Sequence, residues 1–99
     1  MTDYLYVIGN NTDKQKIGFS KDVNKRLKTL QTGNPDELKI HYTIECPSEK
    51  TRKLEKKIHT ELSYKKLKGE WFAMSPTEAI NYLEFARITW LNDSNIYNY

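Results

Sequence analysis

Two short apolar segments near the start of the chain carry the first side chains that could take part in catalysis. Tyr6 lies in the β-prone run 4–8, and Lys16 begins a second such run after the turn-forming cluster 9–13. A turn centred on Asn11 would set Tyr6 directly opposite Lys16 on one face of a hairpin. A cation beside a phenol favours the phenolate and lowers the pKa of the phenol, so the pair could accept a proton. An ordinary exposed cross-strand pair is the alternative.

An arginine on the helix predicted over about 22–31, with Asp22 as its N-cap, is the next candidate. On a helical wheel Arg26 flanks the apolar stripe that faces the sheet, whereas Lys25 lies on the solvated side. An arginine turned toward a sheet usually has an anionic partner, in the protein or in a ligand. An internal ion pair with Glu70 and a contact with a bound anion therefore both remain open.

The two histidines have different surroundings. His59 falls at the edge of the apolar stripe of a second predicted helix, one turn after Glu55. It could reach an active face or serve as a hydrogen-bonded structural residue. His41 falls on the polar side of an alternating strand and is expected to be inert. Neither histidine combines with the single cysteine, Cys46, in a zinc-site spacing.

The elements that must position these residues follow the order ββαβα(β)α. This order predicts an α+β fold with a small central, mostly antiparallel β-sheet flanked by three helices. The core-directed face of the hairpin is predicted to carry Leu5, Val7, Ile17 and Phe19. We expect one domain over 1–91 and a polar tail over 92–99. The predicted elements are a hairpin over 4–19, a strand over 38–45, a helix opening at Pro47-Ser48, an extended segment over 70–74, and a third helix from the Ser75–Glu78 capping box to about Trp90.

The composition excludes several classes of protein. No run approaches the ~18 apolar residues of a spanning helix, and the first residues lack the pattern of a signal peptide. One cysteine excludes an internal disulfide and suits a reducing compartment. The sequence therefore predicts a cytoplasmic protein that does not enter the membrane.

The charge is unevenly distributed along the chain. Residues 14–68 hold 15 of the 16 Lys and Arg against seven acids, giving +8, whereas the remainder carries −5. Such a concentration favours a polyanionic partner, with a solvated lysine-rich face as the alternative.

Five segments in order resemble the motifs of the GIY-YIG nuclease superfamily: Tyr4-Leu5-Tyr6-Val7-Ile8, Lys16-Ile17-Gly18, Arg26, His59 and Gly69-Glu70-Trp71-Phe72. The resemblance covers roughly residues 4–85 and is closest to the small phage and viral branch, whose second motif reads KIG. Two positions depart from the family pattern, because Tyr4 replaces the opening glycine and Lys16 replaces the second tyrosine. Asn81 is the nearest counterpart of a late asparagine, and a helix-surface role is its alternative.

The resemblance implies a metal-dependent endonuclease that hydrolyses phosphodiester bonds in DNA. Tyr6 would be the general base, assisted by Lys16, and Arg26 would hold the scissile phosphate. Glu70 would bind one Mg²⁺, or Mn²⁺ in its place, and His59 would join the catalytic set.

The same resemblance implies contacts with the nucleic-acid backbone, and it favours DNA over RNA. Trp71 and Phe72 could stack on bases or belong to the core. A catalytically weak binding module and a phage protein-interaction factor are the alternatives, and a protein partner could supply specificity. If a phage encodes the protein, it would act in the host cytoplasm. The expected backbone contacts are Lys14, Lys21, Lys25, Arg52, Lys53, Lys56, Lys57, Lys65, Lys66 and Lys68.

Overall fold

A computed structural model describes residues 1–91 of the chain. Its centre is an antiparallel sheet with the strand order β3-β1-β2-β4, so the first strand of the chain is an inner strand. The strands are β1 (Thr2–Gly9), β2 (Lys14–Ser20), β3 (Lys39–Pro47) and β4 (Trp71–Ala73). The helices are α1 (Val23–Gln31), α2 (Ser48–Glu61) and α3 (Pro76–Ala86), with a short 3₁₀ turn η1 (Ser63–Lys65) and a π-helical turn η2 (Arg87–Leu91).

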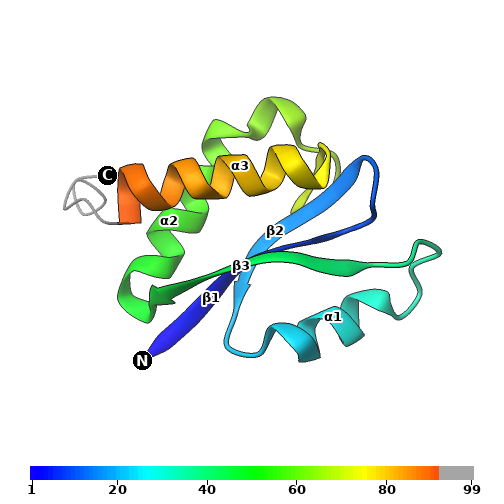
Figure 1. Ribbon diagram of the computed structural model, residues 1–99, viewed down its shortest axis with the longest axis horizontal. Helices are drawn as coiled ribbons and strands as arrows, with labels where there is room; N and C mark the ends of the chain where they lie inside the picture. The colour runs from blue at the N-terminus through cyan, green and yellow to red at the C-terminus, as the bar shows by residue number, and fades with distance from the viewer. Residues whose placement is uncertain (92–99) are drawn as a thin grey trace.

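Helices cover both faces of the sheet. Alternate residues of a strand point to opposite faces, and β1 is apolar on both. Figure 1 shows α2 and α3 together on one side of the sheet and α1 on the other. On the α2/α3 side, the larger core includes Leu5, Val7 and Ile17, with Phe19 packed against it. The predicted α+β class and the predicted core-directed face of the hairpin are both confirmed.

The hairpin register differs from the prediction. Tyr6 pairs with Gly18, and Lys16 pairs with Ile8. The cause is Asn10, whose side-chain oxygen accepts three successive backbone N–H groups, from residues 12 to 14, at 2.9–3.0 Å. This Asx-type turn moves the centre of the hairpin one residue along the chain. The predicted direct opposition of Tyr6 and Lys16 is therefore wrong, although the two residues still share a face.

The predicted starts of two helices are confirmed by their caps. Asp22 accepts the backbone N–H of Lys25 at 3.0 Å at the start of α1. Ser75 and Glu78 exchange the two hydrogen bonds of a capping box at the start of α3. The predicted tail over 92–99 lies outside the described residues. Within the part that the structure describes, every helix is too short or too polar to cross a bilayer.

Candidate active site

The candidate residues meet at the outer edge of β2, where the sheet is incomplete. β4 pairs with β2 only between residues 14 and 16. One residue further, the N–H of Ile17 donates to the backbone oxygen of Glu70 at 3.4 Å. The carbonyl oxygen of Ile17 accepts Nε2 of His59, on α2, at 2.8 Å. Residue 70 and α2 therefore close the edge of β2, and both bring polar side chains to it.

Tyr6 lies over Gly18 with its phenol close to Glu70. A Cβ atom on Gly18 would lie 2.7 Å from Oη of Tyr6 and 3.5 Å from Oε1 of Glu70. The phenol and the carboxylate thus approach the same point above β2, and a glycine there makes room for them. Tyr6 itself is only 1% exposed.

The electrostatics of Tyr6 correct one expectation. Burial raises the pKa of Tyr6 to about 12, and the charges of Glu70 and Glu55 act in the same direction. The nearby Arg26 guanidinium opposes this rise in pKa but does not cancel it. The expected lowering of the Tyr6 pKa is therefore wrong, because desolvation outweighs the charge of Arg26.

Lys16 is directed at Glu70 from the same face of β2. Its Nζ lies 3.0 Å from Oε1 of Glu70 and 5.8 Å from the centre of the Trp71 ring. The Lys16 side chain is 12% exposed, whereas that of Glu70 is 44% exposed. The ion pair holds the Glu70 carboxylate at the sheet edge and leaves part of it open to solvent.

Arg26 lies exposed on α1. Its guanidinium lowers the pKa values of both Tyr6 and Glu55, so it stands close to the two groups. Among residues 1–91 it forms no ion pair. The internal pair with Glu70 is thus not formed, and the five donors of Arg26 remain available to an anion.

Glu55 is the site residue to which the sequence analysis gave no role. It is half-buried on α2, one turn before His59. Burial, reinforced by the charge of Glu70, raises the pKa of Glu55 to about 7, while Lys16 and the nearby arginines oppose the rise. The available signal was its i, i+4 spacing from His59, which sets both side chains on one helix face.

These acidic groups and His59 form a compact set of metal-ligand types. One ligand atom each from Glu55, His59 and Glu70 lies within 4.8 Å of the others. Carboxylate oxygens and imidazole nitrogens are the donors of many divalent-metal sites in proteins.

The two aromatic residues after Glu70 differ in burial. Phe72 is fully buried and meets the ring of His59 edge-on, with 4.9 Å between ring centres. Trp71 is partly buried and packs against the smaller apolar cluster on the α1 side of the sheet. The core alternative therefore holds for Phe72.

The profile of the T5orf172 domain matches residues 3–87. This chain belongs to the T5orf172 domain family. The family is phage-associated and related to nuclease-like folds of the GIY-YIG and HNH type, which indicates a nuclease-like or DNA-binding module. The matched range includes every residue of the candidate site. Comparisons with curated proteins and with solved structures found no match.

Two other polar residues of this T5orf172 domain lie apart from the edge of β2. His41 directs Nε2 at the backbone oxygens of Gly9 and Asn10, at 3.2 and 2.9 Å. It therefore braces the turn region of β1. Asn81 is exposed on α3, beside Tyr82 and Leu62, as its helix-surface alternative predicted.

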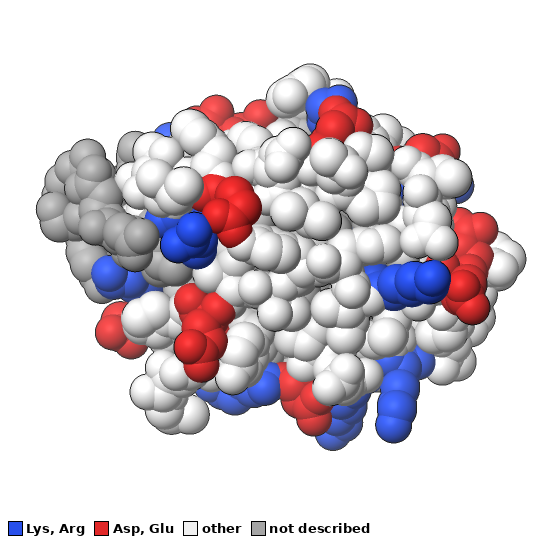
Figure 2. All heavy atoms as spheres, viewed as in Figure 1, with Lys and Arg blue, Asp and Glu red and all other residues white. Residues whose placement is uncertain are grey.

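The predicted backbone contacts of the T5orf172 domain differ in ion pairing and in exposure. Lys21, Lys57 and Lys65 form ion pairs with acids at 2.9–3.3 Å. Figure 2 shows acids and bases around a largely uncharged middle on the face in view, with basic side chains projecting along the margin near α1. The predicted backbone contacts that are exposed are Lys14, Lys21, Lys25, Arg52, Lys53, Lys56, Lys66 and Lys68.

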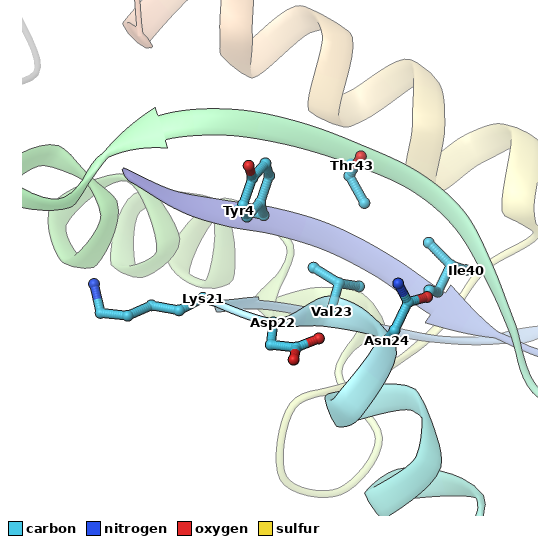
Figure 3. A pocket seen from close by; sticks show the side chains of 7 residues that line it. All are labelled: Tyr4, Lys21, Asp22, Val23, Asn24, Ile40 and Thr43. Atoms are coloured by element: carbon cyan, nitrogen blue, oxygen red, sulfur yellow. The ribbon is translucent and has the colours of Figure 1, made fainter. Parts of the chain in front are cut away.

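A hollow of about 470 Å³ opens on the α1 side of the sheet (Figure 3). Its walls come from β1, β3 and the start of α1. Tyr4 lies two residues from Tyr6 on the same face of β1, and Asp22 precedes Arg26 by one helical turn. The hollow therefore lies on the same side of the sheet as Tyr6, and none of its lining residues belongs to the candidate site. Its lining residues are Tyr4, Lys21, Asp22, Val23, Asn24, Ile40 and Thr43.

Proposed function

We propose that this T5orf172 domain is a divalent-metal-dependent endonuclease that hydrolyses phosphodiester bonds in DNA. One observation carries the proposal: a phenol and a carboxylate approach the same point above Gly18, with Lys16 paired to that carboxylate. Arg26 supplies an unpaired guanidinium beside them. Membership in a phage-associated, nuclease-related family supports the same function.

The residues at the β2 edge fit Mg²⁺ or Mn²⁺. Glu70 is the proposed ligand, since its carboxylate is 44% exposed and such ions usually keep waters and phosphate oxygens among their ligands. A bound ion would supply polarisation of the scissile phosphate and stabilisation of the leaving oxygen.

The protein's own groups have separate proposed roles. Arg26 holds the scissile phosphate and stabilises the charge that develops on it. Lys16 orients Glu70 through their ion pair. Tyr6 accepts the proton of the attacking water. Because burial raises the Tyr6 pKa to about 12, the phenolate is scarce at neutral pH, so we expect the cleavage rate to rise with pH above neutrality.

The raised pKa of Tyr6 also supports a second candidate function, a nucleic-acid-binding module without useful turnover. A phenol that keeps its proton, beside a carboxylate neutralised by Lys16, provides little general-base catalysis. The exposed basic residues would serve binding alone in that case.

Cleavage assays on plasmid, single-stranded and branched DNA, with Mg²⁺, Mn²⁺ or EDTA, separate the two candidates. We expect Glu70→Ala to abolish cleavage and to leave DNA binding intact or slightly tighter, because the variant loses a metal ligand and a negative charge. Tyr6→Phe should lose turnover with little loss of affinity, since it deletes only the phenolic oxygen.

Glu61→Ala is the matched control, because Glu61 lies on α2 and pairs with Lys57 away from the β2 edge. It should leave cleavage unchanged. Equal cleavage by Glu70→Ala and the parent would assign the activity to another site or to a contaminant. A parent that binds DNA and cleaves none of the substrates would favour the binding module.

A further inference from the structure

The cluster at the β2 edge contains more metal-ligand groups than Glu70 alone. Glu55 and His59 occupy successive turns of α2, and Glu70 precedes β4. One ligand atom from each of the three lies within 4.8 Å of the others, and all three residues are partly buried. α2 and the residue just before β4 therefore bring two carboxylates and an imidazole close to one point.

A backbone hydrogen bond and a ring contact fix the His59 side chain. A carbonyl oxygen only accepts hydrogen bonds, so the 2.8 Å contact with Ile17 requires the proton on Nε2. The lone pair of the neutral ring is then on Nδ1. Ligating histidines commonly donate their other ring N–H to a backbone carbonyl, which fixes both tautomer and orientation. The edge contact with Phe72 further restricts the ring plane.

Two carboxylates face each other at the cluster, with the cations Lys16, Arg26 and Arg52 nearby. Glu55 and Glu70 bring two carboxylates to a partly buried edge, and Lys16 pairs with only one of them, at 3.0 Å from Oε1 of Glu70. A divalent ion between the carboxylates would offset their mutual repulsion.

We propose that Glu55, His59 and Glu70 form a single three-ligand site for a first-row transition-metal ion. The proposal deepens the proposed function, on which it rests for the role of this edge as the active site. A carboxylate alone suits Mg²⁺, whereas imidazole favours transition metals, whose affinities rise from Mn²⁺ to Co²⁺. The site therefore binds Co²⁺ more tightly than Mn²⁺, and Mn²⁺ more tightly than Mg²⁺.

Metal titrations of the full chain without DNA test this order, with calorimetry for all three ions and the visible spectrum for Co²⁺. We expect Glu55→Gln, His59→Gln and Glu70→Gln each to weaken Co²⁺ binding by at least about tenfold. Loss of the nitrogen ligand in His59→Gln should also narrow the preference for Co²⁺ over Mg²⁺. Glu61→Gln and His41→Gln are matched controls outside the cluster and should bind Co²⁺ as the parent does.

The outcomes test the three-ligand metal site separately from the proposed endonuclease function. If Mg²⁺ binds the parent protein as tightly as Co²⁺, the proposal is overturned, whatever the folding of the variants. It is also overturned if a folded Glu55→Gln variant keeps the parent affinity while Glu70→Gln loses it; cleavage through Glu70 alone would then stand. If all three variants lose Co²⁺ while the parent cleaves no DNA, the metal site stands and the endonuclease function fails.

Discussion

The close approach of Tyr6 to β2 predicts a sharp effect of replacing Gly18 with alanine. The added Cβ would lie 2.7 Å from Oη and 3.0 Å from Cζ of Tyr6. Ordinary contact begins at 3.4 Å, so Oη must move by about 0.7 Å. Tyr6 is 1% exposed and packs in the cluster with Ile8 and Leu38, so this movement strains its neighbours.

Both stability and activity should respond to this displacement. Overpacking of a well-packed site costs about 1–3 kcal/mol. For a domain of this size each kcal/mol lowers Tm by roughly 4–8 °C. Since a misplacement of about 1 Å can cost 10²-fold in rate, we expect cleavage to fall roughly 10- to 100-fold in the Gly18→Ala variant.

A double-mutant cycle with Tyr6→Phe isolates the cause. Phenylalanine lacks the oxygen that would lie 2.7 Å from the new Cβ, so Gly18→Ala should cost less stability in that background. Thermal unfolding of the four proteins gives the coupling free energy. Ile44→Val is the control for a general loss of stability, because it truncates the core on the opposite face of the sheet by about 0.5–1.5 kcal/mol.

The Ile44→Val control should keep cleavage near the parent rate. A Gly18→Ala protein with unchanged Tm and unchanged cleavage would refute the inference that the phenol is held against β2.

Three further predictions follow from other parts of the fold. Nζ of Lys21 lies 2.9 Å from Oδ1 of Asp3 and lowers the pKa of Asp3 from its usual value. The folded state therefore binds fewer protons than the unfolded chain, and this stabilisation disappears at low pH. In urea unfolding, the stability difference between the parent and Asp3→Asn should therefore shrink from about pH 6 to about pH 3, and a constant difference would contradict this. Ser75→Ala removes the α3 cap, and calorimetry should show a loss of about 1 kcal/mol. If Lys56 and Lys66 each contact a phosphate, each alanine variant should reduce the slope of log K against log salt by about 0.7–0.9; an unchanged slope would exclude that contact.

The hairpin shows which part of the fold local sequence could predict. Alternation along β1 and β2 correctly divided their side chains between two faces, because burial selects apolar residues at every second position. The register depended on the Asn10 side chain, whose three hydrogen bonds lengthen the turn. The shift moved the pairing by two positions, so Tyr6 and Lys16 kept a common face even though their predicted direct contact was wrong.

The site was less accessible to sequence reasoning because it depends on contacts between distant segments. The spacing of Glu55 and His59 was visible, but the approach of α2 to the edge of β2 was not. The pKa of Tyr6 is also a tertiary effect, because the burial of Tyr6 in the cluster with Ile8 and Leu38 outweighs the charge of Arg26. The local sequence pattern identified the types of residue at the site, whereas tertiary packing determined the direction in which the pKa of Tyr6 is shifted.

The short pairing between β2 and β4 has a consequence for when the site can exist. Tyr6, Lys16, Arg26 and His59 come from β1, β2, α1 and α2, and Glu70, just before β4, comes last in the chain. During synthesis the set is incomplete until the ribosome has released Glu70 and its backbone has joined Ile17. Any opening that detaches the three paired residues of β4 also withdraws Glu70. The set of five residues is therefore complete only after Glu70 has joined the sheet, and a chain whose β4 is detached does not carry it.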